Sequence, residues 1–418
     1  MKLFFFLLFI NFQIIAQVEY SQSIVPVGEY FGFYIDAANF QGDSPEKTRL
    51  DVYYQIPYAN LQFVKYQNKF RAKYSVTLTI YDEDKDKIIN EKTLNGKIVV
   101  NNYDDASSEN NSKFGFKSFE LPPNDYVLTC LLYDKDSKKD FEVEAKLEIR
   151  EFNKPLNFSD ILLISTEIDS QIVLNISNSI TSSDTSLFFF FELYSDKADS
   201  INLVYIVETI DEDEIIKQKE ILVIKQGINQ IKKEIDNSKI SLGQYKIIVK
   251  ALDDDEETIS GTSKSFASKI FGFPSSITNL DNAIEQMAFI ATSDDRDDML
   301  ESESFEEKLE KFKAFWKKED PSPATTQNEV LREYYRRVSY ANKKFKHYYA
   351  GWKTDMGMIY IVLGPPDNVD RHPFEFDTKP YEIWYYYDIN RSFYFLDETG
   401  FGDYRLLNRD YDWFRYGL

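Results

Sequence analysis

Apolar and polar residues alternate at every second position through most of the first two thirds of the chain. Between residues 18 and 271 this alternation coincides with many Val, Ile, Tyr and Phe residues and is interrupted by short polar turns. A period of two is typical of β-strands that bury one face and expose the other. We therefore expect this part of the chain to form sheets.

Two strand-and-turn units recur in the same order within this β-rich part. The predicted strands at residues 68–82 and 201–211 each run into an acidic turn. Farther along, strands that begin at Tyr126 and Tyr245 each reach an acidic turn eight residues later. Repetition of two units in one order favours two tandem β-sandwich domains of the immunoglobulin-like type.

The acidic turn that begins at Asp82 has the carboxylate spacing of a calcium loop over its first three ligands. Lys87 stands where such a loop needs glycine, and no Glu follows at the twelfth position. We therefore interpret the turn as a solvated hairpin tip and expect no metal site.

From about Pro274 the apolar period changes to three and four residues, which predicts helices. The first is expected at residues 280–290. Ser304 with Glu307 then forms the capping-box pattern that starts a second helix, and Thr326 with Glu329 does so for a long third helix.

The sequence Gly-Trp-Lys-Thr-Asp at residues 351–355 follows this long helix. Gly351 is expected to end the helix in a left-handed conformation, and Trp352 is expected to pack against its last turn. Thr354 or Asp355 can then cap a short helix that Gly364 closes, although the composition of residues 359–363 is also that of a strand. We favour the short helix.

The first residues have the pattern of a secretory signal. Lys2 precedes an apolar run at residues 3–15, which ends at Ala16. The run is shorter than the roughly 20 residues that span a bilayer, so we expect cleavage near Ala16 and no transmembrane segment in the mature chain. The alternative is an uncleaved N-terminal anchor.

The predicted architecture is mixed, with two tandem all-β, immunoglobulin-like sandwich domains followed by a helical segment and a small α+β C-terminal domain. A strand pair at residues 381–387 and 391–396 supplies the last of these. The expected boundaries are a signal peptide at 1–16, sandwiches at 18–152 and 153–271, a helical segment at 275–350 and an α+β core at 351–418.

The net negative charge of the chain argues against anionic partners over most of the molecule. The chain has a net charge of −21, and loss of Lys2 with the signal would make it −22. This excess of negative charge repels nucleic acid and anionic membrane surfaces, so we expect neither as a partner. The single cysteine, Cys130, cannot close an internal disulfide and is expected to be a buried strand thiol.

The long helix and the residues after it are positively charged, in contrast to the rest of the chain. Residues 332–353 hold seven basic residues and Glu333 as the one acidic residue. Arg332, Arg336, Lys343 and His347 fall within one arc of a helix, a face suited to an anionic ligand or partner. The alternative is that this face is solvated or pairs with the protein's own acidic segment at residues 294–310.

The last third of the chain resembles the bacterial GWxTD domain family, which is named after the motif at residues 351–355. Other shared features occur in the family's order, namely Phe315-Trp316, residues 337–342, residues 364–367 and residues 381–385. Met356 departs from the family, where Arg is common at this position. The resemblance implies a secretory signal, β-rich N-terminal domains and this C-terminal unit, and it implies no established activity.

Enzymatic chemistry finds little support in the sequence. The two histidines, His347 and His372, do not lie beside a Ser or Cys in a recognisable nucleophile motif. Glycine-rich phosphate loops and Cys/His clusters are absent from the sequence, so we expect no cofactor. The alternative is a glycan hydrolase that uses Asp355 together with Glu382 or Asp367.

We therefore predict a non-catalytic, exported protein of the bacterial cell envelope, periplasmic or extracellular, which binds an envelope protein or a glycan through its C-terminal domain. The expected binding residues surround an aromatic concavity near the motif. They are Trp352, Thr354, Asp355, Asp367, Trp384, Arg336 and Arg337.

Overall fold

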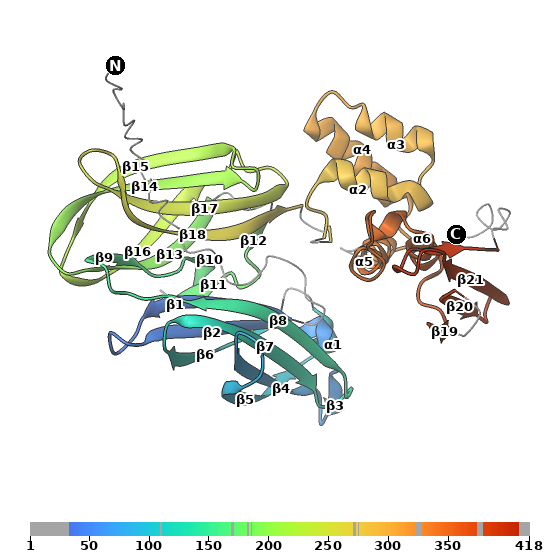
Figure 1. The fold of residues 1–418 in the computed structure, drawn as a ribbon, viewed down its shortest axis with the longest axis horizontal. Helices are drawn as coiled ribbons and strands as arrows, with labels where there is room; N and C mark the ends of the chain where they lie inside the picture. The colour runs from blue at the N-terminus through green and yellow to red at the C-terminus, as the bar shows by residue number, and fades with distance from the viewer. Residues whose placement is uncertain are drawn as a thin grey trace, which may run out of the picture. The chain divides into compact units, whose positions relative to one another are not determined.

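The computed structural model describes residues 33–408, with gaps at 109–110, 169–170, 182–183, 185, 271–272, 275, 323–327 and 374–378 (Figure 1). The predicted signal peptide at residues 1–16 lies outside the described residues. The chain divides into two compact units, the first holding most of the β-rich part and the second running mainly from Ala267 onward. Each unit is described by itself.

The first sandwich packs a three-stranded sheet against a five-stranded one. The smaller sheet has the order β1-β2-β6, and the larger has the order β3-β4-β7-β8, with β5 also paired to β4. Its strands are β1 (Tyr34–Gln41), β2 (Thr48–Pro57), β3 (Val64–Tyr66), β4 (Lys69–Asp82), β5 (Ile88–Val100), β6 (Ser112–Leu121), β7 (Asn124–Asp134) and β8 (Asp140–Ile149), with a short helix α1 (Tyr103–Ser107) before β6. Alternate apolar residues from both sheets form one core, as the period of two predicts.

The second sandwich also consists of two sheets. One has the order β11-β10-β13-β16, with β9 also paired to β13, and the other has the order β12-β18-β17-β14-β15. The strands are β9 (Leu156–Phe158), β10 (Leu162–Ile168), β11 (Gln171–Leu174), β12 (Ser179–Thr181), β13 (Ser186–Ser195), β14 (Asp199–Thr209), β15 (Glu214–Ile224), β16 (Gly227–Asp236), β17 (Gly243–Leu252) and β18 (Thr258–Lys269).

The two sandwiches repeat one topology. The order β1-β2-β6 corresponds to β10-β13-β16, and the run β5-β4-β7-β8 corresponds to β15-β14-β17-β18. Even the hairpin tips agree, because Lys85 and Glu212 have positive φ in the first hairpin of each copy, as Lys138 and Glu256 have in the second. The predicted tandem, immunoglobulin-like fold is confirmed.

The acidic turns are hairpin tips. The Asp82 carboxylate accepts a hydrogen bond from the backbone N–H of Lys87 across the tip, at 3.0 Å, so this side chain closes its own turn. Within the part of the chain that the structure describes, no group of three or more His, Cys, Asp or Glu residues is arranged to hold a metal ion.

Two residues of β7 show how the sequence specifies this strand. The Tyr126 hydroxyl donates a hydrogen bond to the carbonyl of Pro122 at 3.0 Å, the tyrosine corner that is typical of immunoglobulin-like folds. Cys130 is fully buried, and burial raises the pKa of its thiol far above the ordinary value. The prediction of a buried strand thiol is confirmed.

The second unit carries the helices and a small sheet. The helices are α2 (Leu280–Gln286), α3 (Ser293–Leu300), α4 (Phe305–Lys318), α5 (Glu329–Lys344) and α6 (Asp355–Leu363), with 3-10 turns η2 (Met287–Phe289) and η3 (Gly351–Lys353). Strands β19 (Asn368–His372), β20 (Tyr381–Tyr386), β21 (Arg391–Asp397) and β22 (Tyr404–Leu406) form an antiparallel sheet in that order. Among the residues that the structure describes, no helix has the length and apolar character needed to cross a membrane.

Helix starts show which capping predictions were right. Ser304 caps α4, as predicted, because its side chain accepts a hydrogen bond from the Glu307 N–H. For α5 the cap is Asn328, whose side chain accepts from the Leu331 N–H at 2.9 Å. Helix α5 therefore begins at Glu329, and the cap predicted at Thr326 is wrong in position, although Thr326 itself lies in a gap.

Candidate functional site

Gly351 is required for a reason other than the predicted one. Helix α5 ends at Lys344, and Gly351 opens the turn η3 without a positive φ, so the predicted left-handed helix end is wrong. A Cβ atom at this position would lie 1.9 Å from the carbonyl oxygen of Ala341. Glycine is needed because η3 lies directly against the backbone of α5.

Trp352 belongs to the helical core. Its side chain is 7% exposed and packs edge-on against Phe289, with 6.2 Å between the ring centroids. Its backbone N–H donates a hydrogen bond to the side chain of Asn342 at 3.1 Å. Trp352 therefore helps to hold η3 and α5 together, and its ring has little surface left for a ligand.

The polar residues of the motif fasten neighbouring elements. The Thr354 hydroxyl accepts from the Gly357 N–H at 3.0 Å and donates to the Gly351 carbonyl at 2.7 Å, which caps α6. The Asp355 carboxylate accepts from the backbone N–H of Leu406 at 2.8 Å and so ties β22 to α6. The favoured short helix after Thr354 is confirmed.

Arg336 and Arg337 both pair with Glu333 within α5, and Arg337 also joins α5 to α6. Both guanidinium groups donate to the Glu333 carboxylate, at 2.6 to 2.7 Å. The hydrogen bond from Arg336, together with that from Arg337, outweighs burial, which raises the pKa, and leaves the pKa of Glu333 below its ordinary value. Arg337 also donates to the carbonyls of Ile361 and Val362, which satisfies the end of α6. These two arginines are thus engaged within the fold.

Asp367 and Trp384 organise the small sheet. The Asp367 carboxylate accepts from the backbone N–H of Tyr387 at 2.6 Å. Trp384 is 3% exposed, and its indole N–H donates to Glu382 at 3.0 Å, while Glu382 also accepts from Arg371 at 3.2 Å. Trp384 packs in the cluster between the sheet and α6, whereas Trp352 packs among the helices, so the two tryptophans do not share one concavity.

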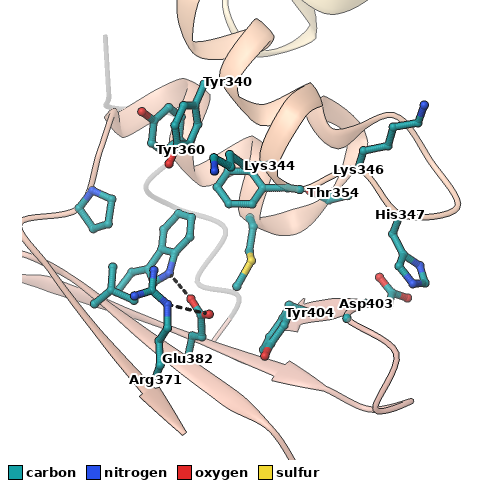
Figure 2. A pocket seen from close by; sticks show the side chains of 16 residues that line it. Tyr340, Lys344, Lys346, His347, Thr354, Tyr360, Arg371, Glu382, Asp403 and Tyr404 are labelled. Atoms are coloured by element: carbon teal, nitrogen blue, oxygen red, sulfur yellow. Dashed lines mark hydrogen bonds and ion pairs between the residues drawn. The ribbon is translucent and has the colours of Figure 1, made fainter. Parts of the chain in front are cut away.

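A cavity of about 360 Å³ lies between the end of α5, helix α6 and the sheet β19–β22 (Figure 2). We call it the helix–sheet pocket. It is lined by Tyr340, Lys344, Phe345, Lys346, His347, Thr354, Met356, Tyr360, Pro366, Val369, Arg371, Glu382, Trp384, Gly402, Asp403 and Tyr404. Of the seven predicted binding residues, Thr354 and Trp384 are in this lining, and the other five are not.

The pocket combines aromatic walls with charged groups. Tyr340 stacks on Tyr360 at 4.3 Å between ring centroids, and Phe345 packs against Trp384 at 5.5 Å. Figure 2 shows Lys344 on the helix side, and it shows the paired Arg371 and Glu382 on the sheet side.

Sequence reasoning missed most of this lining. The signals that could have identified it were the lysines at the end of the long helix and the alternation of Val369 with Arg371 along one strand face.

One wall of the pocket depends on a buried carboxylate. Asp397 is 3% exposed and accepts hydrogen bonds from the backbone N–H groups of Thr399, Gly400 and Gly402. Burial raises the pKa of Asp397, but these hydrogen bonds together outweigh burial and leave the pKa below its ordinary value. Asp397 thereby holds the loop that brings Gly402 and Asp403 to the pocket.

Comparison with known families identifies the part of the chain that contains the motif and the pocket. The family model of the GWxTD domain matches residues 251–408. The C-terminal third of this chain is a GWxTD domain. Met356, where Arg is common in the family, is buried in the wall of the helix–sheet pocket. Met356 therefore adds an apolar side chain and no charge to the pocket of this GWxTD domain.

Other comparisons add no functional information. No curated protein sequence matches the chain. A glycosyl hydrolase family 2 member from Bacteroides cellulosilyticus is similar over 52% of this chain and 26% of its own, with 9% identity and a TM-score of 0.22. Bacteroides uniformis beta-glucuronidase is similar over 52% of this chain and 26% of its own, with 10% identity and a TM-score of 0.21. Alpha-2-macroglobulin from Escherichia coli is similar over 59% of this chain and 17% of its own, with 14% identity and a TM-score of 0.21. The similar regions cover about a quarter of these proteins or less, and the TM-scores support no inference about activity.

Proposed function

We propose that this protein is exported to the bacterial cell envelope, where its GWxTD domain binds a protein partner in the helix–sheet pocket and performs no chemistry. The observation that carries the proposal is the composition of the pocket, which has aromatic walls and lysines at its rim. Such a combination of apolar interior and polar rim is typical of recognition sites.

The carboxylates of the alternative, a glycan hydrolase, have other roles. Asp355 and Asp367 each accept a hydrogen bond from a backbone N–H and do not line the pocket. Glu382 does line it, but it is held by Trp384 and Arg371. A glycosidase needs two carboxyl groups that face its substrate from opposite sides. The predicted pairs of Asp355 or Asp367 with Glu382 do not meet in the pocket.

Export is proposed from the sequence, because Lys2, the apolar run at residues 3–15 and Ala16 form the three parts of a secretory signal. We expect N-terminal sequencing of the mature protein to begin at or near Gln17. Recovery of a membrane-bound form that retains Met1 would contradict export with cleavage.

A bulky substitution on the pocket wall tests the binding function. Val369 lines the pocket, whereas its neighbour Asn368 on the same edge strand is exposed and does not. We expect Val369→Trp to fill the cavity and abolish cross-linking of the full-length protein to its envelope partner in the source bacterium. The matched variant Asn368→Trp should retain the same cross-linked species. Equal cross-linking by both folded variants would contradict binding in the pocket.

A second experiment separates binding from hydrolysis. The wild-type protein is incubated with purified envelope glycan, and released sugars are measured beside Glu382→Gln. We expect no release from either protein. Release by the wild type that is lost in a folded Glu382→Gln variant would show that the pocket is catalytic and would overturn the proposal.

A further inference from the structure

Two lysines line the helix–sheet pocket, and a third precedes them in the sequence. Lys343 and Lys344 end helix α5, and Lys346 follows in the next loop. All three are exposed, and none has an ion pair or hydrogen bond from its side chain to another residue in the described part of the chain. Lys344 and Lys346 line the pocket itself. Their charges are therefore available to a ligand.

The acidic groups of the pocket are already neutralised. Glu382 pairs with Arg371 at 3.2 Å, and Asp403 pairs with Arg405 at 2.8 Å. The lysines thus leave the pocket with a local positive charge, although the whole chain carries −21. A local field of opposite sign to the net charge attracts an anionic ligand and excludes a cationic one.

The pocket as a whole has the size of a side-chain site. A cavity of about 360 Å³ lies at the low end of the range for ligand sites, which is sufficient for one or two large side chains. Two aromatic residues on the adjoining loops, Tyr348 and Phe401, are 82% and 77% exposed. Exposed aromatic groups beside an aromatic pocket are typical of surfaces that bury a partner's apolar anchor.

A glycan fits this arrangement less well. The two tryptophans offer little face for a sugar ring, because Trp384 is 3% exposed and Trp352 lies in another cluster. Neutral glycans also have no use for the lysines. An acidic peptide uses both the charge and the apolar cavity.

We propose that the occupant of the helix–sheet pocket is an extended acidic segment of a partner protein, which inserts one large apolar side chain between the helices and the sheet. Its carboxylates lie over Lys344 and Lys346. This inference rests on the proposed function and specifies the chemistry of the partner.

The test uses the full-length protein without its predicted signal peptide and a fluorescein-labelled nine-residue peptide with Phe at its centre and Glu elsewhere. Fluorescence anisotropy measures Kd. We expect binding that weakens about tenfold when Glu is replaced by Gln, about tenfold when Phe is replaced by Ala, and further as salt is raised.

Protein variants locate the effect. Lys344→Gln with Lys346→Gln should weaken binding of the acidic peptide about tenfold. The matched variant Lys313→Gln with Lys317→Gln removes two exposed lysines of α4 that do not line the pocket, and it should bind as the wild type does. Equal Kd values for the two double variants would overturn the inference.

Further outcomes separate the inference from the proposed function. The Gln peptide could bind as tightly as the Glu peptide, with Val369→Trp abolishing the binding of both. The pocket would then bind peptides, but the inference that its occupant is acidic would be wrong. If vesicles containing phosphatidylglycerol or a sulfated oligosaccharide bind through the lysines and no peptide does, the occupant is wrong. If no peptide binds and Val369→Trp leaves the envelope cross-links unchanged, both proposals fail.

Discussion

At the scale of single residues, the Gly-Trp-Lys-Thr-Asp motif is mainly a device for folding. Gly351 allows close packing on α5, Trp352 fills the helical core, Thr354 caps α6 and Asp355 holds β22. The pocket lies beside these residues because they position α5, α6 and the sheet. Keeping these residue types would therefore preserve the positions of the elements that form the pocket, and most of the motif residues do not line the pocket themselves.

Gly351→Ala tests this interpretation. The added methyl group would lie 1.9 Å from the Ala341 carbonyl oxygen, so η3 must move away from α5. We expect a loss of about 3 kcal/mol in the free energy of unfolding, measured by chemical denaturation. Lys353→Ala, at an exposed position of the same turn, should change stability by less than about 0.5 kcal/mol. A similar loss in both variants would contradict the close-packing explanation.

Thr354 provides a second test at this scale. Thr354→Val removes the hydroxyl that caps α6 and should destabilise the protein by about 1 to 2 kcal/mol, whereas Thr354→Ser keeps the hydroxyl and should cost less. Thermal unfolding of both variants measures the difference. Equal stability of the two would show that the cap contributes little.

At the scale of elements, the pocket depends on how loops are held against helices and strands. The loop after β21 is fixed by a single carboxylate, Asp397, through several backbone N–H groups. Helix α6 is fixed at one end by its Thr354 cap and at the other by Arg337. These hydrogen bonds fix the positions of the elements around the pocket, and so they set its width.

The lowered pKa of Asp397 makes this loop sensitive to acid. A carboxylate whose folded pKa lies below its ordinary value of 3.8 stabilises the fold fully above that value, and the contribution is lost as pH falls through the folded pKa. We expect the wild type to be more stable than Asp397→Asn at pH 6, with the difference shrinking as pH falls below 3.8. Thermal unfolding between pH 6 and 2.5 measures this, and a constant difference would contradict the role of ionised Asp397.

At the scale of the molecule, the two sandwiches form one compact unit joined by buried polar residues. Lys264 on β18 pairs with Asp36 on β1 at 2.5 Å, and both side chains are almost completely buried. Burial raises the pKa of Asp36, which the charge of Lys264 opposes. The boundaries proposed between the domains stay predictions, but this ion pair links the first sandwich to the second.

Removing one partner of this pair should be costly. Lys264→Met leaves the Asp36 carboxylate buried without its cation, and we expect a loss of about 3 to 5 kcal/mol in the free energy of unfolding. Adding Asp36→Asn should recover part of that loss in a double-mutant cycle. Lys85→Met, which breaks the exposed pair with Glu144, is the control and should leave stability almost unchanged. Equal losses for the buried and exposed pairs would contradict the proposed link.

The sequence by itself determined the classes of most elements, the repeat of the two sandwiches and the cap at Ser304, and it favoured the short helix after Thr354 over a strand. These features depend on periodicity and on neighbours a few residues apart, so a local pattern suffices to specify them. Only the tertiary structure decided that Asp355 holds Leu406, that Gly351 lies against Ala341 and that Lys344 shares a pocket with Tyr404. Those relations depend on how α5, α6 and the sheet pack in three dimensions, which alternation along the chain does not encode.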